Sequence, residues 1–111
     1  MTVEEYANKM NMEILTGKIG LGKQISGMYI CDLLSWVMSH ARKGEAWITV
    51  LTNLNVVAVA LLTEVSCVII PEGIGVEDQT INKAISEEIP ILRSNLNSYH
   101  ISKKSSGLIG G

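Results

Sequence analysis

The chain has 111 residues, of which 47% are hydrophobic and 18% charged, and its formal net charge is −2. A chain of this length forms one domain and can bury a core without disulfides or metals. The charge leaves no basic surface typical of nucleic-acid binding. The longest apolar run, residues 56–62, is far shorter than the roughly 20 residues of a membrane span. We therefore expect neither a nucleic-acid partner nor a membrane.

The two cysteines, Cys31 and Cys67, both lie inside apolar runs. Such positions suit reduced thiols in the core of a protein from a reducing compartment. No charged and then apolar leader precedes residue 20, so no secretion signal is predicted. We expect a cytoplasmic protein.

Short apolar runs alternate along the chain with amphipathic stretches that begin at residues favoured as helix N-caps. Thr2 with Glu5 forms a capping-box pattern, and Asp32 and Asn53 stand where the next two helices should begin. Pro71 closes a continuous apolar run that is typical of a central parallel strand. The expected helices are 3–10, 33–40, 54–64, 77–88 and one from 94 or 95 to about 107, and the expected strands are 12–15, 24–30, 46–51, 67–70 and 90–92.

Strands that alternate with helices over short connections predict a parallel sheet with helices on both faces. The expected fold class is therefore α/β, with three layers and a mostly parallel sheet of about five strands. We expect a single domain over residues 1–106 and a disordered tail over residues 107–111.

The expected helix 54–64 is apolar nearly all the way round. A helix without a polar face must be covered on every side, and the sheet of a small domain can cover only one. We therefore predict a homodimer in which a second copy covers the other side, with Trp36 close to the contact. The candidate interface residues are Trp47, Leu54, Val57, Ala58 and Leu61.

Ligands of open α/β sheets bind beyond the carboxyl ends of the strands. Helix N-termini at that edge carry free N–H groups that suit phosphate, and Asn and Ser side chains can bind polar groups. The same residue types can equally serve the fold as helix caps, and both readings stay open here. The candidate ligand-binding residues are Asp32, Ser35, Thr52, Asn53, Asn55 and Asn95, with Glu72 and Ser94 at the same edge.

Three other features indicate chemistry only weakly. Residues 17–24 match the phosphate-binding pattern G-x4-G-K, but Gln24 stands where Ser or Thr should hold magnesium and a strand follows instead of a helix. His40 and His100 have no metal-ligand spacing to each other or to the cysteines. Cys31 has no base close to it in the sequence. We expect no catalytic residue, no metal, no cofactor and no enzymatic activity.

On residues 15–17, 27–38, 46–49, 55–60 and 69–73, the chain resembles the DRTGG domain family, although the Asp-Arg-Thr-Gly-Gly string itself is absent. The resemblance runs from about residue 2 to residue 94. It implies a fold similar to the N-terminal domain of HPr kinase/phosphorylase, which is not the catalytic part of that enzyme. It also implies an accessory module, of the kind found in pyrophosphatases with CBS domains and in some phosphate acetyltransferases. The family offers no catalytic residues to carry over.

The expected function is that of a non-catalytic regulatory or assembly module that forms a homodimer and acts on a separate protein. The alternative is a sensor that binds a nucleotide or another phosphorylated small molecule at the carboxyl ends of the strands.

Overall fold

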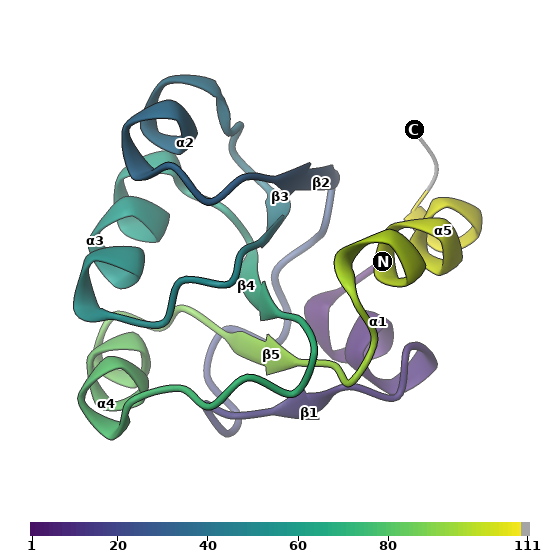
Figure 1. The fold of residues 1–111 in the computed structure, drawn as a ribbon. Helices are drawn as coiled ribbons and strands as arrows, with labels where there is room; N and C mark the ends of the chain where they lie inside the picture. Colours follow the sequence, from purple (N-terminus) through teal and green to yellow (C-terminus); the bar gives the residue numbers. More distant parts are fainter. Residues whose placement is uncertain (110–111) are drawn as a thin grey trace.

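The computed structural model describes residues 1–109, in which five strands form one sheet between two layers of helices (Figure 1). The strands are β1 (Glu13–Ile14), β2 (Gly27–Ile30), β3 (Glu45–Ile48), β4 (Cys67–Ile70) and β5 (Ile91–Arg93). The helices are α1 (Val3–Lys9), α2 (Leu34–His40), α3 (Leu54–Thr63), α4 (Asp78–Ser86) and α5 (Ser98–Ile109). None of these helices has the length and apolarity required to cross a membrane.

The sheet has the strand order β1-β5-β4-β3-β2, so β4 is its central strand. β2, β3, β4 and β5 run parallel, whereas β1 pairs antiparallel with β5. Helices α2, α3 and α4 cover one face of the sheet, and α1 and α5 cover the other (Figure 1). This arrangement confirms the predicted three-layer α/β fold with a mostly parallel sheet.

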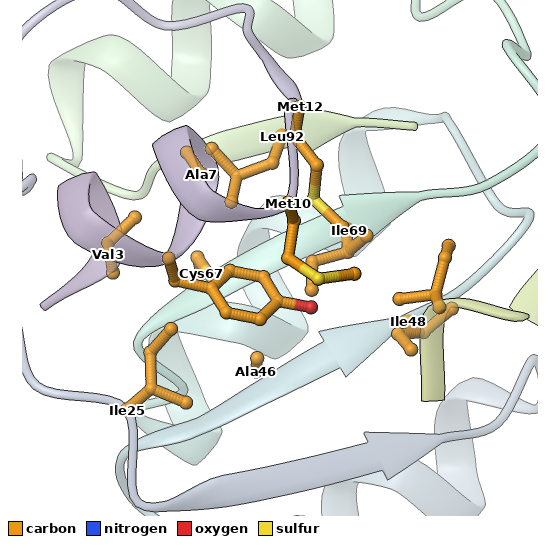
Figure 2. Close-up of a cluster of buried hydrophobic side chains, with 12 residues drawn as sticks. Val3, Ala7, Met10, Met12, Ile25, Ala46, Ile48, Cys67, Ile69 and Leu92 are labelled. Atoms are coloured by element: carbon orange, nitrogen blue, oxygen red, sulfur yellow. The ribbon is translucent and has the colours of Figure 1, made fainter. Parts of the chain in front are cut away.

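Alternation along β4 divides the core into two clusters, because successive strand side chains point to opposite faces. Cys67 and Ile69 belong to the cluster under α1 and α5, which Figure 2 shows. Val68 and Ile70 belong to the cluster under α2, α3 and α4. All four side chains are buried, as expected for a strand covered on both faces.

A buried hydrogen bond joins the first and last helices across the first cluster. The hydroxyl groups of Tyr6 in α1 and Ser105 in α5 lie 2.6 Å apart, and both residues are fully buried. Burial raises the pKa of Tyr6 from its ordinary value of 10.0 to about 12, although the bond to Ser105 opposes this rise. Burial also raises the pKa of Cys67 in the same cluster from 9.0 to about 12.

Several boundaries differ from those expected. The second strand begins at Gly27, not at residue 24, and the third ends at Ile48. Asn97, not Ser94 or Asn95, caps the last helix, since its Oδ1 accepts the His100 N–H at 2.9 Å. Residues 107–109, expected in the tail, are part of α5, while 110 and 111 lie outside the described residues.

We predict that the free energy of unfolding falls as the pH rises from about 9 toward about 12. The raised pKa values of Cys67 and Tyr6 mean that the unfolded chain releases these protons at lower pH than the folded chain does. Stability is therefore fully present below the unfolded pKa values and is lost as the pH rises through the folded ones. Urea unfolding at about pH 8 and about pH 11 measures the difference. Cys67→Val should reduce the decline, and a free energy that stays constant over this range would contradict the prediction.

Candidate functional site

Because β2, β3, β4 and β5 are parallel, their carboxyl ends meet at one edge of the sheet. The loops that leave this edge carry the polar residues proposed for ligand binding. Asp32 and Ser35 follow β2, Asn53 opens the helix after β3, and Asn95 follows β5. These polar residues therefore lie at the predicted edge of the sheet. Their roles differ from one residue to the next.

The sequence predicted that Asp32 caps α2. In the structure, Asp32 instead joins the loop after β2 to the loop after β3. Its Oδ1 accepts the Thr49 hydroxyl at 2.8 Å and the Val50 N–H at 2.9 Å, whereas Leu33 occupies the N-cap position without a side-chain bond. The carboxylate provides an acceptor for the Val50 amide, which lies beyond the end of β3. Since Asp32 lies seventeen residues from Thr49, only the folded chain reveals this bond.

Asn53 caps α3 as predicted. Its Oδ1 accepts the Asn55 N–H at 2.9 Å, so this side-chain oxygen serves the helix. The side chains of Ser35 and Asn55 are exposed on the first turns of α2 and α3, and Thr52 is half-buried between the strand and the helix. These three residues have no side-chain hydrogen bond that ties them to the fold of residues 1–109.

Asn95 lies with the loop that follows β4. A side chain added at Gly73 would approach its Oδ1 to 3.0 Å, and backbone bonds from Glu72 to Leu96 and from Gly73 to Ser94 hold the two loops together. Asp32 and Asn95 follow strands that are three positions apart in the sheet, which is roughly 14 Å at the usual strand spacing. One phosphate group therefore cannot contact both residues, although an extended ligand can span them.

A hollow of about 520 Å³ lies at the opposite edge, beside the starts of β2, β3 and β4. Its two lysines are already engaged: Lys23 Nζ donates to the Glu88 carbonyl at 2.7 Å, and Lys43 Nζ lies 3.7 Å from a Glu64 carboxylate oxygen. No sequence pattern indicates this hollow, because four separate segments form it. The lining residues are Lys23, Gln24, Lys43, Gly44, Leu61, Glu64, Val65 and Ser66.

Lys23 belongs to the glycine-rich motif of residues 17–24, and the structure shows where this motif lies. The motif lies in turns before β2, and no helix follows it at which phosphates would find free N–H groups. Residues 17–24 are part of the connection between β1 and β2. In the part of the chain that the structure describes, no group of three or more His, Cys, Asp or Glu side chains could hold a metal ion.

Two of the five candidate interface residues were wrong. Trp47 and Val57 are buried, and the Trp47 indole N–H donates to the Cys31 carbonyl at 2.9 Å. Leu54, Ala58 and Leu61 are exposed, and Leu62 joins them with 69% of its surface accessible. These four residues follow the i, i+4, i+7, i+8 spacing of one helix face, which we call the α3 surface. A helix that is apolar all round does not reveal in its sequence which face meets the sheet.

We predict that Asp32→Ala lowers the free energy of unfolding by about 1.5–3 kcal/mol, because it removes a charged acceptor from two donors. Asp78→Ala in the first turn of α4 is the control, since this exposed carboxylate contributes about 0.3–1 kcal/mol through the helix dipole. Urea unfolding compares the two variants. An equal loss in both would contradict a special role for Asp32.

The comparisons with known proteins bear on both the fold and the family. No curated protein matches the chain. A crystal structure of the CBS and DRTGG domains of the regulatory region of Clostridium perfringens pyrophosphatase, complexed with the activator diadenosine tetraphosphate, has a TM-score of 0.70 to this structure at 15% identity. The match covers 92% of this chain but 44% of that one, so the present chain spans less than half its length. The family model of the DRTGG domain matches residues 5–107. Since this match includes nearly the whole chain, the chain belongs to the DRTGG domain family, as its sequence indicated.

Proposed function

We propose that this chain is a non-catalytic regulatory and assembly module that pairs with a second copy of itself and acts on a separate protein. Membership in the DRTGG family supports the regulatory role, because the similar solved structure is the regulatory region of a pyrophosphatase. The polar residues at the carboxyl edge of the sheet support a non-catalytic role. Asp32 and Asn53, the two that the fold engages most directly, hold loops and a helix end.

The observation that carries the pairing is the α3 surface. Val56, Val57, Val59 and Ala60 are buried in the cluster that α3 shares with the sheet, α2 and α4, yet the opposite side of the helix presents leucines to solvent. α3 contains no charged residue. In a two-fold pair the same patch meets itself, so an uncharged patch can do this without repulsion between like charges. A second copy therefore fits this surface better than it would fit a charged one.

We predict that the α3 surfaces of two copies lie against each other. Ala58 is at the middle of this surface, so Ala58→Cys in a Cys31→Ser background should form a disulfide-linked dimer under mild oxidation. The remaining Cys67 is buried and does not compete. Adding Leu62→Lys should abolish the cross-link, because the new charge would be buried against the other copy.

Tyr99→Cys is the matched control, since Tyr99 is similarly exposed but lies on α5 in the other helix layer. It should not cross-link. Non-reducing electrophoresis gives the result, and an Ala58→Cys variant that stays monomeric would remove the proposed contact.

A second candidate function is the sensing of a nucleotide or another phosphorylated small molecule at the carboxyl edge. The observation that favours it is the diadenosine tetraphosphate in the similar pyrophosphatase structure. In this chain, Asn95 after β5 lies some distance from the exposed residues after β2 and β3. This separation suits an extended ligand with several phosphates. The N-terminus of α3 lies between them and favours an anion.

We predict for this function that diadenosine tetraphosphate or ATP raises the thermal midpoint. A ligand at 100 times its dissociation constant adds about 2.7 kcal/mol, which is several degrees for a domain of this size. Asn95→Ala should reduce the shift, whereas Asn82→Ala on the exposed side of α4 should leave it unchanged. Equal midpoints with and without a broad set of nucleotides would contradict ligand sensing.

A further inference from the structure

Strand β2 forms one border of the sheet, and its outer side has no neighbouring strand. The Cys31 N–H donates to the Ile48 carbonyl, which places the backbone groups of Cys31 on the side of β3. Backbone groups alternate in direction along a strand, so those of Met28 and Ile30 point away from β3. Among residues 1–109, no backbone group outside the ladder bonds to either residue. The edge of β2 is therefore available for pairing.

Gly27–Ile30 contains neither a charge nor a proline, two of the features that usually prevent strands from pairing. α5 contacts β2 from the face of the sheet, where Met28 packs in the first cluster. Asp32 is the only charged residue in 27–38, and its Oδ1 is engaged by Thr49 and Val50. Apolar side chains flank the edge instead: Ile30 is 48% exposed, Leu33 61% and Trp36 53%.

The other border of the same sheet shows the contrast. β1 has only two residues, and the carboxylate of Glu13 lies 2.8 Å from the guanidinium of Arg93 on the neighbouring β5. A short strand with a charged pair is a protected edge. The border at β1 is therefore protected against pairing, whereas the backbone groups of Met28 and Ile30 at the other border have no partner among residues 1–109.

We propose that a second copy pairs antiparallel with β2 along this edge and joins the two sheets into one continuous sheet. The outward direction of Met28 and Ile30 determines the register. Met28 of one copy lies opposite Ile30 of the other and exchanges N–H···O bonds with it in both directions. The two-fold axis then passes between the two Tyr29 residues, which form a non-hydrogen-bonded pair.

Self-pairing suits the composition of this edge. A two-fold axis brings identical residues together, and Gly27–Ile30 contains no charge that would meet itself. Leu33 and Trp36 extend the contact on the face of the sheet that α2 covers, where Tyr29 packs against the core. β2 lies apart from α3 in the fold (Figure 1), so the edge and the α3 surface do not overlap. One copy can therefore use both contacts, so assemblies larger than a dimer should form.

Four proteins test this inference by sedimentation at micromolar concentration: the wild type, Ile30→Lys, Leu62→Lys and the double variant. Both positions are exposed, so the folded monomer tolerates either lysine, and circular dichroism checks the fold. We expect the wild type to exceed a dimer, each single variant to form a dimer, and the double variant to be a monomer. An Ile30→Lys protein with the same association state as the wild type overturns edge pairing. An unchanged Leu62→Lys protein instead contradicts the α3 contact of the proposed function.

Amide hydrogen exchange tests the register in the Leu62→Lys protein, which retains only the edge contact. The amides of Met28 and Ile30 should exchange at least about tenfold more slowly at associating concentration than at high dilution. The Tyr29 amide faces β3 and should be protected at both concentrations, which makes it an internal control. Exchange of Met28 and Ile30 that is independent of concentration overturns the proposal.

Discussion

The structure depends on the burial of β4 from both sides. Its four residues have no exposed side chain, and they alternate between two apolar clusters that need separate helix layers. α1 and α5 must therefore close one face, and the bond between Tyr6 and Ser105 ties these two distant helices together. Three helices close the other face. Only a chain with a high apolar content can supply both clusters, which accounts for the 47% of hydrophobic residues.

Six of the ten large apolar side chains that are exposed among residues 1–109 lie on the α3 surface or beside β2. Packing of the core does not explain why these apolar side chains are present. One of the two surfaces is a helix face, which packs through side chains, and the other is a strand edge, which pairs through backbone groups. A regulatory module acts through contacts with other chains, and these two surfaces offer contacts of different kinds. Because the two surfaces differ, a single substitution can disrupt one contact and leave the other intact.

Two of the residues predicted to bind a ligand at the carboxyl edge of the sheet stabilise the fold instead. Asp32 and Asn53 satisfy backbone groups that the ends of β3 and α3 would otherwise leave without protein partners. What remains free for a ligand is the set of exposed side chains after β2 and β3, together with Asn95 some three strands away. These side chains are separated by roughly 14 Å at the usual strand spacing, a distance that an extended ligand can span and a single phosphate cannot.

The local features of this fold follow from the amino-acid sequence alone. The capping box of Thr2 and Glu5, the cap at Asn53 and the buried strand before Pro71 all follow from interactions between residues close in the chain. The family was also evident from short segments. Three other features become visible only in the folded chain: the burial of Trp47, the bond from the Thr49 hydroxyl to Asp32 and the side of α3 that is buried. Each of these depends on which segments meet in space, and neither residue type nor periodicity contains that information.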